Sequence, residues 1–296
     1  MNEAAGVIIA IVSSSLGGSA LAVTRYLTTS ADVVTLAILR WGIGILVVLP
    51  VALALRVKWP SAKDLPAVAM LGICFYGLFF IFYNVAVSYT TAARASLALC
   101  TLPLLTMVAG AALGLEPMTR RKAIGVAIAV SGAAMALATG LSQVPDHAWL
   151  GELIMIAAVL CMAVYNVYSR PFIQRSSALG FLAVGMGGGA VVLLAMGWAT
   201  GRIAILSEFG TEQWIAGAYL GIAGGALAFI LWVLALERAS PTRVANTMTV
   251  NPIAASVLGA HLLGEPITPN IVFGLITVFA GIWIATTGQH DRRRKD

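Results

Sequence analysis

The sequence predicts an all-α integral membrane protein, with ten transmembrane helices arranged as two five-helix repeats of inverted topology. The composition, the spacing of the apolar runs and an internal repeat support this fold. Of the 296 residues, 60% are hydrophobic and only 10% are charged, and the mean hydropathy is +0.94. Soluble globular proteins are about 45–50% apolar and about 25% charged, so this chain has too few polar residues to cover a water-soluble surface.

Apolar runs of about the length that crosses a bilayer follow one another along the chain. A span needs about 20 apolar residues, and backbone groups in lipid must pair internally, so runs without period-two alternation predict helices. The first run has no basic segment before it and is longer than a signal-peptide core, so we expect a retained helix. The predicted spans are 4–27, 33–55, 65–88, 92–115, 121–141, 149–169, 179–200, 214–236, 242–263 and 270–288.

The basic residues indicate how these helices are oriented. With the amino terminus in the cytoplasm, fourteen Lys and Arg residues fall on the inner side, and Arg25, Arg94 and Arg202 fall on the outer side. Cytoplasmic loops retain Lys and Arg, so we expect both termini in the cytoplasm of a bacterial cell, at its inner membrane. The basic tail 291–296 is then an orientation signal that is compatible with anionic lipid headgroups. The net charge of +6 therefore needs no nucleic acid partner.

The second half of the sequence repeats the first. The shift is 149 residues over most of the chain, and 145 near its start, where Arg25 aligns with Arg170. The repeats are expected over 1–144 and 145–290. Five spans are an odd number, so the second copy must insert upside down, as in many secondary transporters. Positions that coincide at the shift of 149 include Pro103 and Pro252, Glu116 and Glu265, Arg94 and Arg243, Tyr83 and Trp232, and Gly132 and Gly281.

Several short motifs occur at matching places in the two halves. They are the Leu-Gly-Glu-Pro-like turns at Leu113–Pro117 and Leu263–Pro266, each followed by Gly-x6-Gly, and Pro103 with its mate Pro252. The pair Arg40-Trp41 in the second predicted span is a further motif. Through these motifs the chain resembles, over essentially its whole length, the EamA-type ten-helix members of the drug/metabolite transporter superfamily. It is most similar to YddG-type aromatic amino acid exporters, through general similarity. The resemblance implies export of aromatic amino acids and of a broader range that includes threonine, methionine, lysine and glutamate.

Aromatic side chains in the third predicted span are candidates for the substrate site. Tyr76, Phe80 and Tyr83 recur at helical spacing, Asn84 lies one position further round, and Trp232 is the repeat mate of Tyr83. Such a face either lines a cavity, where it stacks a substrate and offers one polar contact, or packs against other helices and lipid. The adjacent Asn84 and the repeat symmetry make the cavity interpretation about as well supported as the packing interpretation.

Polar side chains inside other spans are further candidates. Arg40 is the one cation within a predicted span, and an arginine at such a depth usually faces protein or water. It either binds a substrate carboxylate or extends towards the interface and backbone carbonyls. Asn246 and Asn251 make the ninth span more polar than its mate. Their amides either hydrogen-bond a substrate or join helices to one another.

Backbone breaks are expected at Pro103 and Pro252, inside the fourth and ninth spans. A proline removes one helical hydrogen bond and clashes with the preceding turn. The kinks either expose carbonyls to a cavity and take part in gating, or serve packing alone. No predicted span carries Asp or Glu near its middle, where many proton-coupled carriers place a relay, so the sequence favours gradient-driven efflux without excluding coupling.

The chemistry that the sequence lacks narrows the function further. The three cysteines have no metal spacing, and no phosphate-binding Gly-Lys-Ser/Thr loop occurs, so we expect no metal, cofactor or ATPase subunit. The leading hypothesis is a non-enzymatic secondary transporter, with the lipid bilayer and a small-molecule amino acid as partners. Exporters of other metabolites or drugs remain an alternative. An intramembrane enzyme would need clustered acid/base groups, and a channel would need rings of charge or backbone carbonyls. The sequence shows neither pattern, so both are less favoured than a transporter.

The predicted orientation can be tested in the loop 142–148, which it places outside the cell. We expect a cysteine introduced there to react with an impermeant thiol reagent added to intact cells, because an outer loop is exposed to the medium. Labelling that occurs only after lysis would reverse the predicted topology.

Overall fold

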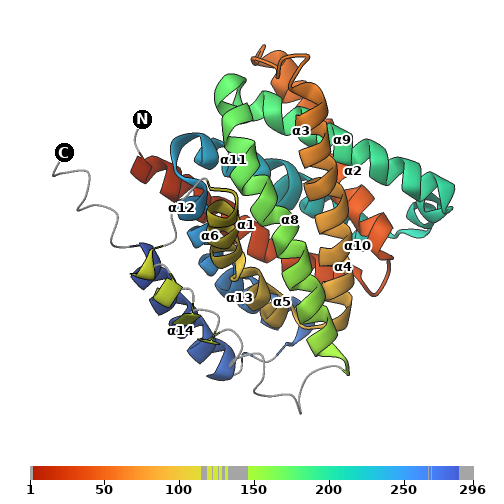
Figure 1. Ribbon diagram of the computed structural model, residues 1–296. Coiled ribbons are helices and arrows are strands. Elements are labelled where there is room, and N and C mark those ends of the chain that lie inside the picture. Colours follow the sequence, from red (N-terminus) through yellow and green to blue (C-terminus); the bar gives the residue numbers. More distant parts are fainter. Residues whose placement is uncertain are drawn as a thin grey trace.

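The computed structural model shows an all-helical bundle, with α1 crossing its middle and α14 at its edge beside α5 (Figure 1). It describes residues 3–114, 119–121, 123–125, 127–128, 131–132, 146–265, 267 and 269–286. Most of the predicted fifth span, the repeat boundary at 144 and the tail 291–296 lie outside these residues.

Seven helical segments in the described part of the chain are long and apolar enough to cross a membrane. Four of them are continuous helices: α1 (Glu3–Leu27), α2 (Val33–Ala54), α8 (Ala148–Arg175) and α9 (Ala178–Ala199). The other three are composite: α3 (Leu65–Gly72), η1 (Ile73–Phe79) and α4 (Phe80–Tyr89); α5 (Ala92–Leu99) and α6 (Leu102–Ala112); and α10 (Thr211–Gly221), η4 (Ile222–Leu227) and α11 (Ala228–Arg238).

Shorter helices cover the last two predicted spans. The ninth span consists of α12 (Pro241–Asn246), the 3₁₀ turn η5 (Thr247–Val250) and α13 (Asn251–Leu263), and the tenth is α14 (Pro269–Thr286). A further 3₁₀ helix, η3 (Arg202–Glu208), lies between α9 and α10. The structure therefore confirms an all-helical membrane fold.

The two halves build the same elements at the same offsets. Helices α2 and α9 are both 22 residues long, and they start 145 positions apart. The elements η1 and η4 are both π-helices, and they start 149 positions apart. The first helix of each half packs against helices of the other half. Helix α1 contacts α11 and α13, and its counterpart α8 contacts α4 and α6. This crossed pairing is the arrangement expected of two repeats related by a pseudo-two-fold axis, and it confirms the duplication.

Local capping explains why matching helices start at matching residues. The Asp32 carboxylate accepts a hydrogen bond from the Val34 amide at 3.0 Å, and at the corresponding place the Ser177 hydroxyl accepts one from the Gly180 amide at 3.0 Å. Side-chain oxygens at these positions satisfy backbone N–H groups that the first helical turn leaves without partners. Thr91 and Ser240, which are also repeat mates, cap α5 and α12 in the same way.

The backbone breaks lie just before the two prolines. Helix α5 ends at Leu99 and α6 begins at Leu102, so that Pro103 occupies the first turn of the new helix. In the second half η5 separates α12 from α13, and Pro252 again lies in the first turn. A proline suits this position because its missing N–H would have no helical partner there. The chain thus forms two shorter helices in each half rather than one kinked helix.

Helices from opposite halves approach each other closely at glycine. A Cβ atom on Gly72 in α3 would lie 2.0 Å from the carbonyl oxygen of Gly185 in α9. Its repeat mate Gly221 would meet the Cβ of Ile43 in α2 at 2.4 Å. Lipid provides little hydrophobic drive for helix association, so packing through small residues holds such bundles together.

This close packing predicts the effect of adding a side chain at the interface. We expect Gly72→Val to lower the thermal unfolding midpoint of the detergent-purified protein, through an overpacking cost of about 1–3 kcal/mol. The control is Met70→Ala in the same helix, because Met70 is 65% exposed on the outside of the bundle. Equal midpoints for the two variants would contradict the packing described here.

Candidate functional site

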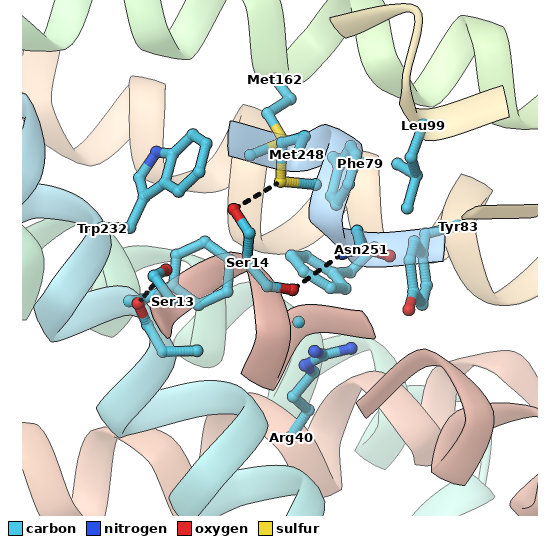
Figure 2. A pocket seen from close by; sticks show the side chains of 14 residues that line it. Ser13, Ser14, Arg40, Phe79, Tyr83, Leu99, Met162, Trp232, Met248 and Asn251 are labelled. Atoms are coloured by element: carbon cyan, nitrogen blue, oxygen red, sulfur yellow. Dashed lines mark hydrogen bonds between the residues drawn. The ribbon is translucent and has the colours of Figure 1, made fainter. Parts of the chain in front are cut away.

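A cavity of about 40 Å³ lies between the two halves (Figure 2). Ser14 and Met162, which line it, lie near the midpoints of α1 and α8, so the cavity is close to the centre of the membrane. Its volume admits a few water molecules, and a larger ligand requires the helices to separate. The lining residues are Ser13, Ser14, Gly17, Arg40, Phe79, Phe80, Tyr83, Leu99, Met162, Ala228, Phe229, Trp232, Met248 and Asn251.

The walls of the cavity follow the repeat symmetry. Four pairs of lining residues occupy equivalent positions in the two halves: Gly17 and Met162, Phe80 and Phe229, Tyr83 and Trp232, and Leu99 and Met248. The cavity therefore lies where the pseudo-two-fold axis passes through the bundle. Transporters built from inverted repeats bind substrate at this place.

Arg40 supplies the one permanent charge among the lining residues. Its side chain is 3% exposed, and its Nη2 donates a hydrogen bond to the Gly224 carbonyl in η4 at 3.1 Å. The guanidinium also lies 4.8 Å from the centre of the Phe80 ring, a cation–π distance. Within the described part of the chain, its Nε and Nη1 groups have no hydrogen-bond partner. Two buried donors are thus left for a ligand.

Asn251 is the second buried polar group of the cavity. It is 1% exposed, and its Nδ2 donates to the backbone carbonyl of Ser14 at 3.4 Å. Among the described residues its Oδ1 has no donor. Ser14 is in turn paired through its hydroxyl with Thr247 at 2.9 Å. These contacts join α1 to η5 and α13 and leave one amide oxygen available.

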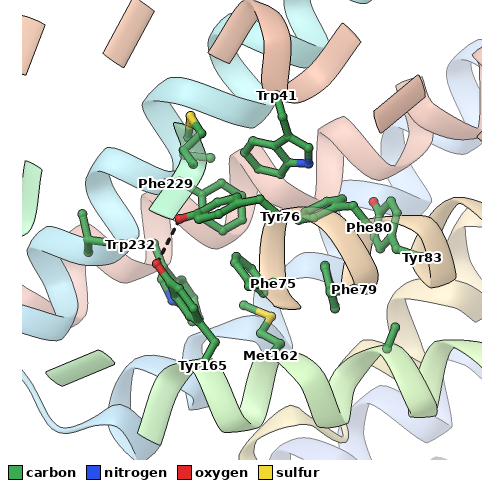
Figure 3. Packing of buried hydrophobic residues seen from close by; sticks show 14 of the residues in the cluster. Trp41, Phe75, Tyr76, Phe79, Phe80, Tyr83, Met162, Tyr165, Phe229 and Trp232 are labelled. Atoms are coloured by element: carbon green, nitrogen blue, oxygen red, sulfur yellow. Dashed lines mark hydrogen bonds between the residues drawn. The ribbon is translucent and has the colours of Figure 1, made fainter. Parts of the chain in front are cut away.

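Aromatic rings hold the walls in place (Figure 3). The Trp41 ring, behind the lining residues, packs edge-to-face against Phe80 and Phe229, with ring centres 4.5 Å and 5.1 Å apart. The indole of Trp232 donates to Asn166 Oδ1 at 3.2 Å. Edge-to-face contacts of this kind stabilise buried rings beyond the effect of burial alone, so rings from both halves form a pre-positioned apolar surface.

The structure distributes the predicted site residues over two environments. Arg40, Phe80, Tyr83, Trp232 and Asn251 line the cavity. The three remaining predicted residues lie outside its lining, where each has another setting. Tyr76 shares a hydrogen bond of 2.9 Å with Tyr165 (Figure 3), Asn84 donates to the Val33 carbonyl at 2.8 Å, and Asn246 ends α12.

A departure from regular helix geometry accounts for the position of Tyr76. It lies in η1, where each turn contains an extra residue compared with an α-helix. The helical spacing that placed Tyr76 on the same face as Phe80 and Tyr83 assumes 3.6 residues per turn. The wider turn instead directs Tyr76 towards α8 and α9.

Several lining residues are not among those predicted from the sequence. Ser13 and Ser14 are polar residues within the first apolar run, and they line the cavity without being among the predicted site residues. Met162 and Met248 resemble ordinary core residues. The internal repeat is the one sequence feature that connects these methionines with other lining residues. Met248 is the repeat mate of Leu99, and Met162 is the repeat mate of Gly17, which lies close to Ser13 and Ser14.

Ion pairs between the halves lie at the end of the bundle where α1 finishes and α5 starts. Arg94 in α5 pairs with Glu152 in α8, and both are buried. Arg25 lies 3.7 Å from Glu265, whose Oε2 also accepts a hydrogen bond from the Ala92 amide at 3.0 Å. Burial raises the pKa of the Glu265 carboxyl. None of these groups lines the cavity, and the described residues contain no cluster of three or more potential metal ligands.

Comparison with known proteins places this architecture in a family. The family model of the EamA-like transporter family matches residues 4–138 and 149–287, one copy in each half. A relative from Streptantibioticus cattleyicolor, named "Probable terminal-alkyne amino-acid exporter", is 28% identical over 81% of this chain and 80% of its own. An "Uncharacterized transporter" from Archaeoglobus fulgidus is 24% identical over 90% of this chain and 93% of its own.

The fold is also shared with a protein of solved structure. One crystal structure matches all of this chain and all of its own with a TM-score of 0.72 and 21% identity. The family match in each half agrees with the duplicated elements, the crossed packing and the cavity between the repeats. The chain belongs to the EamA-like transporter family and is a multi-pass membrane transporter rather than an enzyme.

Proposed function

We propose that this protein exports amino acids from the bacterial cytoplasm across the inner membrane, without ATP, and that Arg40 binds the substrate carboxylate. The observation that carries the proposal is that the Nε and Nη1 atoms of Arg40 have no partner among the described residues of the cavity between the repeats. Buried donors without partners are costly. A carboxylate can accept from one of them together with the second hydrogen of Nη2, in the planar, two-pronged geometry that guanidinium prefers.

The position of Arg40 connects binding with movement of the halves. Arg40 belongs to α2 in the first repeat, and its Nη2 is bound to Gly224 in η4 of the second. A carboxylate held by Arg40 is therefore held at the boundary between the repeats. Rocking of one repeat against the other opens such a site to each side of the membrane in turn. With both termini in the cytoplasm, substrate would enter from that side and leave on the other.

The relatives support the choice of substrate class. The relative from Streptantibioticus cattleyicolor is named as an amino-acid exporter and aligns over four fifths of this chain. Amino acids carry the carboxylate that the cavity is equipped to bind. The described lining contains no Asp, Glu or His, so the carboxylate of a bound substrate meets no negatively charged side chain.

Transport by purified protein in liposomes tests the proposal. We expect saturable uptake of labelled methionine and phenylalanine with no ATP and no imposed ion gradient. Arg40→Gln should lower the initial rate at least about tenfold, because a charge-assisted hydrogen bond contributes about 1.5–3 kcal/mol. The control is Arg175→Gln, since Arg175 lies at the surface and pairs with Asp64.

Gel filtration would show whether each variant is folded. Arg40→Gln transporting at the wild-type rate would remove Arg40 from the site. No saturable uptake of any amino acid, even with an imposed pH gradient, would refute amino acid export and favour another metabolite or drug.

A further inference from the structure

The polar groups of the cavity break the symmetry that its walls obey. At the repeat positions equivalent to Arg40 and Asn251 the chain has Gly185 and Leu102. The equivalent of Ser14 is Val159. Ser14, Arg40 and Asn251, contributed by α1, α2 and α13, thus have no polar counterpart in the other half, while the apolar walls come from both halves (Figure 2).

Chemistry determines which atom of the Asn251 amide faces a ligand. The atom that contacts the Ser14 carbonyl must be the nitrogen, because a carbonyl oxygen accepts hydrogen bonds and cannot donate them. Gly17 keeps this contact open, since a Cβ on Gly17 would lie 3.1 Å from the same nitrogen. The amide is thus held with its nitrogen against α1. Its oxygen, for which the described residues provide no donor, remains as an acceptor in the cavity.

Arg40 and Asn251 together present complementary requirements to one ligand. Arg40 offers two buried N–H donors and a positive charge, and Asn251 offers a buried acceptor. Both residues line the same cavity of about 40 Å³, so a ligand that satisfies both carries an anion and a hydrogen-bond donor close to each other. An α-amino acid has this pattern, because its carboxylate and ammonium are attached to the same carbon atom.

We infer that the oxygen of Asn251 accepts a hydrogen bond from the substrate's α-ammonium group, so that the protein requires a free α-amino group and a side chain without charge. This inference rests on the proposed function and narrows its substrate class. The part of the cavity left for the substrate side chain has no ionisable acid or base, and a buried charge without a partner is costly. Its residues are Phe79, Leu99, Met162, Phe229, Trp232 and Met248.

The inference separates this chain from the broad range that the family resemblance implies. Lysine and glutamate would each bring a side-chain charge into the apolar part of the cavity. Methionine and phenylalanine would place thioether or ring against methionine and aromatic side chains, which are favourable contacts. Charged amino acids should therefore be excluded even though they carry the same α-carboxylate and α-ammonium.

Competition against labelled methionine in liposomes tests the inference on the wild-type protein. The unlabelled competitors are methionine, N-acetylmethionine, lysine and glutamate. N-acetylmethionine keeps the carboxylate and the side chain but has no ammonium group. We expect N-acetylmethionine to inhibit at least about tenfold more weakly than methionine, since a hydrogen bond to a charged group has an effect of this size. We expect lysine and glutamate to inhibit at least about tenfold more weakly as well, because their side-chain charge would be buried without a partner.

A variant of Asn251 identifies the residue responsible. Asn251→Leu introduces the residue of the equivalent repeat position, Leu102, with similar volume. We expect the inhibition constant of methionine to rise about tenfold and that of N-acetylmethionine to stay unchanged. The variant would then no longer prefer methionine over N-acetylmethionine. A general disturbance of the helix would weaken both ligands alike. The matched control is Ser256→Ala, a buried polar position in α13 that does not line the cavity.

The outcomes distinguish the inference from the proposed function. Equal inhibition by methionine and N-acetylmethionine, or equal inhibition by methionine and lysine, would overturn the inference and leave amino acid export standing. An unchanged preference in folded Asn251→Leu would also overturn it. If that variant does not fold, the wild-type competition decides alone. Absence of saturable uptake for every amino acid would instead overturn the proposed function, and the inference with it.

Discussion

Close backbone contact between helices of opposite repeats is the constraint on which the rest of this structure depends. Gly72 meets Gly185 between α3 and α9, its mate Gly221 meets α2, and Gly18 of α1 packs against the backbone of Asn251. In lipid these contacts replace the hydrophobic drive of a soluble core, because helices associate where small residues let them approach. The cavity forms between helices positioned in this way, and its paired walls follow from the duplicated contacts.

Two helix contacts that the repeat makes equivalent have their large residue on different helices. This difference explains how an asymmetric site fits between two similar halves. Where α2 meets η4, Arg40 packs against Gly224 and Gly225. At the equivalent contact between α9 and η1, the large residue is Tyr76, and the glycines Gly185 and Gly189 lie on the other helix. The exchange of large for small keeps the packing at both places, so polar groups can be concentrated on one side of the axis without a void on the other.

Ionic contacts tie the halves together at one end of the bundle and are separate from the cavity. Arg94 and Glu152 pair in a buried setting, where loss of water must be balanced by close contact. Glu265 joins the end of α1 to the first turn of α5 through Arg25 and the Ala92 amide. Any movement that opens the bundle at this end has to separate these groups, whereas the apolar walls of the cavity can part without breaking an ion pair.

The sequence by itself determined the membrane class, the helical character of the spans that the structure describes and the duplication. These follow from composition, from the length of the apolar runs and from the constant offset between matching residues. It also singled out Arg40 and Asn251, since a polar group in an apolar span is conspicuous. Only the tertiary structure decided that Tyr76 turns away from the cavity, because a π-helical turn changes the face on which later residues lie. It also decided that Met162 and Met248 line the cavity, because apolar residues that face a cavity and those that face a packed core have the same sequence pattern.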